Sequence, residues 1–95
     1  MNSKQRAYLR SMCNTLPVIL LVGKEGVTEN TLKSVSDALE ARELIKCGVQ
    51  RGAPVDAREA CSQICEGTGA EPVQCIGSKF CIYRPKEKDS VIVLP

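Results

Sequence analysis

Apolar residues recur along the chain with the spacing of alternating helices and strands. Near the N-terminus they follow the i, i+3, i+4, i+7 rule of one buried helical face. This spacing predicts a helix from about Ser3 to Asn14, whose start can be capped by Asn2 or Ser3. The apolar positions of this helix are Leu9, Met12, Cys13 and Leu16.

The next segment is a continuous apolar run from Val18 to Val22. Such a run predicts a strand that is buried on both faces, as in sheets whose strands are joined by helices. The tight loop Gly23-Lys24-Glu25-Gly26 follows it. Thr28 is then placed to cap a second helix that runs to about Arg42.

From Leu44 to Gln50 apolar and polar residues alternate, which predicts a strand with one buried face. Asp56 and Glu59 have the spacing of a capping box and predict a third helix to about Glu66. Gly67 or Gly69 can end that helix, because glycine readily adopts the left-handed conformation of a helix C-terminus.

The C-terminal third predicts a hairpin. Val73 to Ile76 and Lys79 to Arg84 read as strands, and Gly77-Ser78 fits a two-residue type II′ turn, which needs glycine first. A short apolar tail, Val91-Ile92-Val93-Leu94, is expected to cover an edge of the structure.

The predicted order is therefore α-β-α-β-α-β-β, an α/β protein in which three helices pack on a mixed four-stranded sheet. Strand-helix-strand units favour parallel neighbours, whereas the final hairpin adds an antiparallel pair. The length of 95 residues suits one domain, and we expect residues 1–95 to form it.

Composition excludes several classes of function. The apolar fraction is 43% and the charged fraction 25%, which is ordinary for a globular domain. No apolar run approaches the ~20 residues of a membrane span, and the first residues lead into no signal-peptide core. We therefore expect a cytoplasmic protein with no membrane partner. The net charge of +2 permits nucleic-acid binding without requiring it.

Catalytic and metal-binding patterns are missing from the sequence. The chain has six cysteines and no histidine, which excludes Ser-His-Asp and Cys-His sites. It has no CxxC pair, and the GxxG loop is neither a dinucleotide-binding nor a Walker A motif. We expect no enzyme activity, no cofactor, no metal and no small-molecule substrate. The six thiols are expected to be reduced and mostly buried.

The GxxG loop and the basic side chains are the candidate binding features. Two glycines let a backbone approach phosphates closely, and the following helix offers free N–H groups and its positive dipole end. On the loop alone, an ordinary turn is the simpler interpretation. With only three aromatic residues in the chain, backbone contact is favoured over base stacking. The basic residues that could form one stripe are Lys4, Arg6, Arg10, Lys24, Lys46 and Arg84.

Three segments together resemble the signature of the CRM domain family, of the bacterial YhbY-like type. The first helix, with Lys4-Gln5-Arg6 and Leu9-Arg10, is also similar to the family's opening helix, so the resemblance covers nearly the whole chain, from about Ser3 to Pro85, in one order and at compatible spacings. Glu25 departs from that pattern, because the family usually has a neutral residue, often Asn, at this position. The segments are Val22-Gly23-Lys24-Glu25-Gly26-Val27-Thr28, Glu43-Leu44-Ile45-Lys46, and Ile76-Gly77 leading to Tyr83-Arg84-Pro85.

The resemblance implies a fold similar to the C-terminal domain of a bacterial translation initiation factor. It also implies RNA binding, with ribosomal RNA or a precursor of the large ribosomal subunit as the expected partner. The expected contacts are the loop residues Gly23, Lys24, Glu25 and Gly26, with Lys46 and Arg84 serving RNA rather than stability, and Lys4, Arg6 and Arg10 nearby.

Two other hypotheses remain open from the sequence. A protein-interaction module without RNA affinity is favoured by Glu25 and by the low net charge. A thiol-based redox protein is motivated only by the six cysteines. A salt-dependent RNA titration separates the first from RNA binding, and thiol pKa values test the second.

Overall fold

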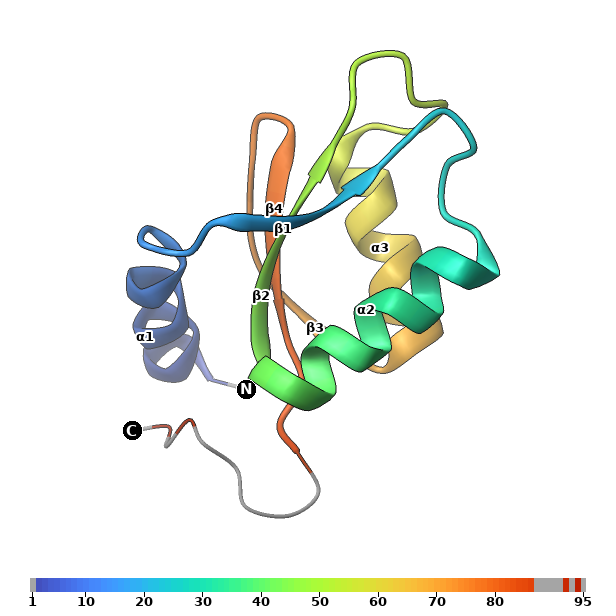
Figure 1. The fold of residues 1–95 in the computed structure, drawn as a ribbon. Coiled ribbons are helices and arrows are strands. Elements are labelled where there is room, and N and C mark those ends of the chain that lie inside the picture. Colours follow the sequence, from blue (N-terminus) through green and yellow to red (C-terminus); the bar gives the residue numbers. More distant parts are fainter. Residues whose placement is uncertain (1, 87–91, 93, 95) are drawn as a thin grey trace.

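A computed structural model describes residues 2–86, 92 and 94, and it has the predicted order of helices and strands (Figure 1). The elements differ from the predicted ranges by at most two residues at either end. They are α1 (Ser3–Cys13), β1 (Val18–Val22), α2 (Glu29–Arg42), β2 (Leu44–Val49), α3 (Ala57–Thr68), β3 (Glu71–Ile76) and β4 (Lys79–Tyr83).

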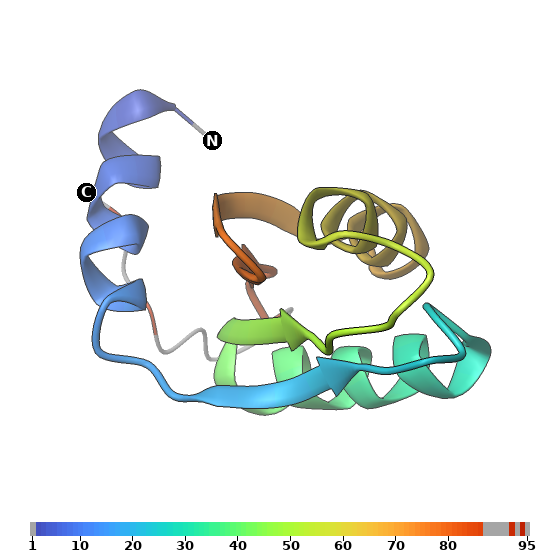
Figure 2. The ribbon, with the colours of Figure 1, turned by 90° about the horizontal axis from the view of Figure 1, so that it is seen from above.

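The four strands form one mixed sheet in the order β1-β2-β4-β3. β1 and β2 are parallel, and β4 lies antiparallel to both β2 and β3. Viewed from above, α1 lies on one face of the sheet, and α2 and α3 lie together on the other (Figure 2). This confirms the predicted α/β architecture of three helices on a four-stranded sheet.

Local side-chain hydrogen bonds fix the start of each helix. Asn2 accepts a hydrogen bond from the backbone N–H of Gln5, and Thr28 accepts one from that of Thr31, each within a capping box. Asp56 accepts from the N–H of Glu59 at 2.8 Å, which is one half of the capping box predicted there. Each cap satisfies an N–H that has no partner inside the helix.

Two apolar clusters lie on the two faces of the sheet. The larger one joins α2 and α3 to the strands around Ile45, Phe80 and Ile82. The smaller one joins α1 to Leu44 and Tyr83 on the opposite face. Within the described residues no helix is long and apolar enough to cross a membrane.

The predicted burial of the first two strands is wrong. The first strand was expected to be buried on both faces and the second on one face, and the structure shows the reverse. β1 is an edge strand, and 56% of the Leu21 surface is exposed together with 37% of that of Ile19. β2 lies between β1 and β4, and four of its six residues are buried. The apolar run of β1 does not show whether a neighbouring strand lies on one side or on both, so periodicity alone could not decide.

The C-terminal third has the expected hairpin turn. Gly77 has a φ of 60° while Ser78 does not have a positive φ, as a type II′ turn requires. Of the predicted apolar tail, Ile92 and Leu94 pack against the α1-side cluster. Val91 and Val93 lie outside the described residues.

A buried carboxylate, which the sequence did not single out, ties this tail to the sheet. Glu43 is fully buried between α2 and β2 and has a φ of 66°. Its Oε2 accepts a hydrogen bond from the N–H of Lys86 at 2.8 Å, and its Oε1 accepts one from the N–H of Ile92 at 2.9 Å. A positive φ is unfavourable for a side chain with a Cβ, so these contacts must offset that cost.

We predict that Glu43→Gln destabilises the fold, because one carboxylate oxygen becomes an NH₂ group that faces a backbone N–H. Two donors then oppose each other in a buried site, at a cost of about 1–3 kcal/mol. Urea unfolding measures the change, and Glu66→Gln, at an exposed position of α3, is the matched control. Equal midpoints for the two variants would contradict the role of Glu43.

Candidate nucleic-acid interface

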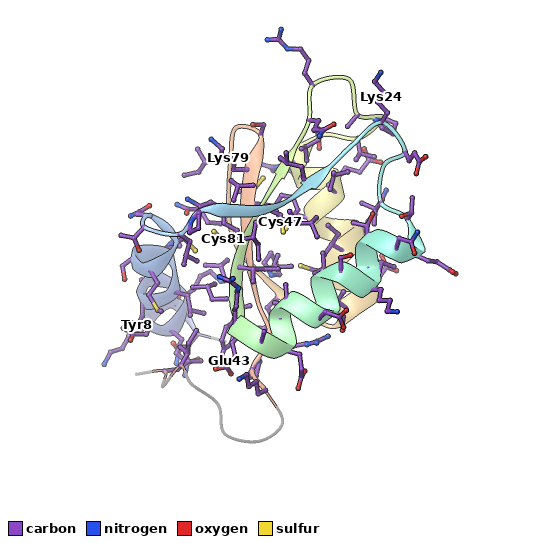
Figure 3. All side chains as sticks on the ribbon, viewed as in Figure 1. Tyr8, Lys24, Glu43, Cys47, Lys79 and Cys81 are labelled. Atoms are coloured by element: carbon purple, nitrogen blue, oxygen red, sulfur yellow. The ribbon has the colours of Figure 1, made fainter. Side chains whose placement is uncertain are left out.

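The GxxG loop is a tight turn that requires glycine at its last position. The N–H of Gly26 donates to the carbonyl of Gly23 at 3.0 Å, which closes the turn. Gly26 has a φ of 73°, and a Cβ there would lie 3.1 Å from Cγ of Pro54. Lys24 and Glu25 at the tip are exposed, and Lys24 points away from the body of the domain (Figure 3).

A second loop, Gln50 to Pro54, packs against the GxxG loop. The N–H of Gln50 donates to the carbonyl of Val22 at 2.8 Å. A Cβ at Gly23 would lie 3.3 Å from the side-chain oxygen of Gln50. Both loops follow the ends of parallel strands and therefore lie at the same end of the sheet (Figure 1).

Arg51 is the residue that the sequence analysis missed at this end. Its side chain is exposed in the second loop and, among the described residues, forms no ion pair. Its signal in the sequence was its place beside Gly52 directly after a strand, where loops of parallel strands commonly bind ligands. Lys24 and Arg51 thus project from two loops that touch.

The charge at this end of the domain is nearly balanced. Glu25 at the loop tip and Glu29 in the first turn of α2 are exposed carboxylates. They oppose the two cations Lys24 and Arg51, so the attraction for phosphate is weaker than the glycine pattern alone indicates. The side chain of Thr28 also occupies the N–H of Thr31, one of the free donors of the helix.

Lys46 lies apart from the loop, in the middle of β2. It stands opposite Val18 and Cys81 on the face of the sheet that carries α1, and it is half-buried. Lys79, at the start of β4, is exposed on the same face (Figure 3). Lys79 was not among the predicted site residues.

Arg84 lies at the opposite end of the sheet from the loop, where it joins α2 to α3. Its guanidinium donates to the carbonyl of Thr68 at 2.8 Å and to the carbonyl and hydroxyl of Ser36, both at 3.1 Å. It also lies 3.5 Å from a carboxylate oxygen of Glu40. These contacts give Arg84 a stabilising role between α2 and α3, which the sequence analysis did not expect.

Lys4, Arg6 and Arg10 are exposed on α1, which lies across the domain from the GxxG loop in both ribbon views (Figures 1 and 2). The six basic residues expected in one stripe therefore fall into separate places. Lys24 belongs to the loop end, Lys46 to the sheet face, and Arg84 to the far end of the sheet.

All six cysteines are free, as expected, and four of them are buried. Cys65 is half-buried and Cys75 is exposed. Burial raises the pKa of Cys47 to about 12. A hydrogen bond from the neighbouring thiol lowers the pKa of Cys13, beside Cys81, and of Cys61, beside Cys65.

Residues 1–84 match the model of the CRS1/YhbY (CRM) domain. The chain belongs to the CRM domain family. Its CRM relatives include YqeI of Bacillus subtilis, named a probable RNA-binding protein, which is 36% identical over the whole of this chain and 99% of its own length.

Two other relatives agree with this assignment. A protein of Haemophilus influenzae named as RNA-binding is 32% identical over 96% of this chain and 92% of its own length. The solution structure of a Staphylococcus aureus protein superposes with a TM-score of 0.82 at 40% identity, covering 100% of this chain and 99% of that one. The CRM assignment therefore holds for sequence and fold together.

We predict that Arg84→Ala lowers the free energy of unfolding by about 2 kcal/mol, because it leaves the carbonyls of Thr68 and Ser36 without their charged donor. Chemical denaturation measures the change. Arg58→Ala, at an exposed position of α3, is the matched control. If Arg84→Ala matches that control in stability but loses affinity for RNA, the stabilising role is contradicted.

Proposed function

We propose that this CRM chain is a non-catalytic RNA-binding protein. In this proposal its GxxG loop holds the backbone of ribosomal RNA and so assists assembly of the large ribosomal subunit. The observation that carries the proposal is the closed Gly23–Gly26 turn, which exposes Lys24 at its tip and packs against the loop that carries Arg51. The names of the relatives in Bacillus subtilis and Haemophilus influenzae support RNA as the partner.

The proposed contact between the GxxG loop and the RNA backbone is electrostatic and requires a phosphate to come close to the loop. The missing Cβ atoms of the two glycines face Gln50 and Pro54, so the turn packs closely on the second loop and leaves its exposed tip for a phosphate to approach. Lys24 and Arg51 then supply the charge, and the start of α2 adds its dipole. Glu25 and Glu29 reduce the attraction, which favours a modest affinity with strong dependence on salt.

Contact with bases through aromatic stacking is not favoured. Phe80 and Tyr83 are buried in the two clusters, and Tyr8 on α1 is 42% exposed. One partly exposed ring is not a platform on which successive bases could stack. The loop therefore holds RNA with little preference for sequence.

The remaining basic residues extend the path of the RNA in this proposal. Lys46 lies on the sheet face between the loop end and α1, and Lys4, Arg6 and Arg10 continue on α1. The assignment to ribosomal RNA and to the large subunit rests on the family resemblance, in which stand-alone bacterial members associate with large-subunit precursors.

We predict that Lys24→Ala weakens binding to all RNA sequences alike. Loss of one phosphate contact should also flatten the log–log dependence of affinity on salt by about one unit. A fluorescence titration over a range of salt concentrations measures both effects. Lys33→Ala, on the exposed side of α2, removes the same charge elsewhere and should change neither. An unchanged slope for Lys24→Ala would show that the loop is an ordinary turn.

We predict that Glu25→Asn strengthens binding about twofold to fivefold, because it removes a negative charge beside the phosphate. The same titration at low salt measures the gain. Asp37→Asn, an exposed position on α2, corrects for the change in net charge. Equal gains for the two variants would mean that the Glu25 carboxylate points away from the RNA.

The ribosomal part of the proposal has its own test. We expect crosslinking in cells, followed by sequencing of the bound RNA, to recover large-subunit ribosomal RNA and its precursors. Gradient sedimentation should place the protein with large-subunit precursors rather than with mature ribosomes. Recovery of messenger or transfer RNA in place of ribosomal RNA would contradict this assignment and leave the loop contact intact.

A further inference from the structure

A hollow of about 250 Å³ lies on the same face of the sheet as α1, in the part of that face that the helix does not cover. Four of its side chains can form hydrogen bonds and one provides an apolar wall. α1 ends at Cys13, and the part of the sheet face near the β3–β4 turn has no helix over it (Figure 1). The polar side chains are Asn14, Lys46, Gln74 and Lys79, and the wall is Ile76.

Strand register brings these residues together. Lys46, Cys81 and Gln74 stand in one row across β2, β4 and β3. The next row holds Gly48, Lys79 and Ile76. Gly48 has no side chain, and a Cβ there would lie 3.0 Å from the side chain of Leu21, so Leu21 covers this row at β2.

The polar side chains of the hollow have no hydrogen-bond partner within the part of the chain that the structure describes. Among the described residues, the side chains of Asn14, Lys46, Gln74 and Lys79 form no hydrogen bond or ion pair. The hollow thus combines two amides and two ammonium groups, and no carboxylate is among its described lining residues. Ile76 is 66% exposed beside them.

We propose that this hollow binds one unpaired nucleotide of the RNA that the GxxG loop holds. The side chain of Ile76 contacts the face of the base, and the amides of Asn14 and Gln74 hydrogen-bond to its edge. Amides suit this role because they both donate and accept. Lys46 and Lys79 bind the phosphate of that nucleotide. The inference rests on the function proposed above.

Size and position favour a nucleotide over other ligands. The volume is slightly below the roughly 300–1,000 Å³ of pockets that hold drug-sized molecules, so a single ring system fits better than a folded segment. β2, which carries Lys46 of the hollow, runs on into the loop that packs against the GxxG loop. Leu21 precedes Gly23 by two residues, and the N–H of Val49 donates to the carbonyl of Ser78 at 2.8 Å beside Lys79.

The test compares a short single-stranded RNA with a blunt duplex of the same length. In the wild-type protein we expect tighter binding of the single strand, because a paired base cannot enter the hollow. Gln74→Ala should weaken single-strand binding roughly threefold to tenfold and leave duplex binding unchanged. Gln63→Ala, an exposed amide on α3, is the matched control and should alter neither.

Direct observation of the amides makes the test independent of variant stability. In nitrogen–proton correlation spectra of the wild-type protein, the side-chain NH₂ signals of Asn14 and Gln74 should shift on addition of single-stranded RNA. The signal of Gln63 should stay in place. No shift at either amide, together with Gln74→Ala equal to Gln63→Ala, overturns the inference.

The Lys24 variant separates this inference from the proposed function. If Lys24→Ala weakens both RNAs while Gln74→Ala weakens neither, the loop contact stands and the hollow does not bind a base. If Gln74→Ala weakens the single strand while Lys24→Ala has no effect, the hollow is supported and the loop contact fails. A wild-type protein that binds neither RNA overturns both.

Discussion

Parallel pairing of β1 with β2 is the constraint on which the candidate site depends. Because the two strands run in the same direction, the loops that follow them lie at one end of the sheet. The GxxG turn can then pack on Gln50 and Pro54, so that Lys24 and Arg51 are exposed on two touching loops. An antiparallel pair would have placed these loops at opposite ends.

The charged residues divide between the fold and the surface. Two charged residues form contacts within the fold. Glu43 binds the backbone of the segment after β4, and Arg84 joins α2 to α3. Such contacts hold their positions only where the packing around them is complete, since a buried charged group without a partner is costly. Lys24, Arg51, Lys46 and Lys79 remain for a ligand, at the loop end and on the sheet face.

The short first helix gives the sheet two unlike faces. α2 and α3 together cover the larger cluster, whereas α1 covers only part of the other face. The uncovered part carries the apolar side chains of Leu21 and Ile76 together with two lysines and two amides. A face that only lacked a partner helix would be mainly apolar. A protein partner would compete with RNA for this face, and the alternative of a protein-interaction module would use the same exposed residues.

Features that depend on near neighbours in the chain could be predicted from the sequence alone. The helices are capped by Asn2, Thr28 and Asp56, and the turns have their positive φ at Gly26 and Gly77. The motif residues Gly23, Gly26 and Thr28 lie in the GxxG loop and at the start of α2. These features were predictable because each depends on hydrogen bonds and backbone angles within a few residues.

The central strand of the sheet, the partners of Arg84 and the position of the hollow depend on contacts between distant segments, so they could not be predicted from the sequence. The run Val18 to Val22 has the composition of a central strand, yet it forms an edge, because strand order depends on pairings between distant segments. From the sequence, Arg84 was expected to bind a ligand. In the structure its guanidinium donates to acceptors on Ser36 and Thr68, which are far from it in sequence. Contacts of this kind leave no periodic trace in the chain, so the sequence could name the residues but not their partners.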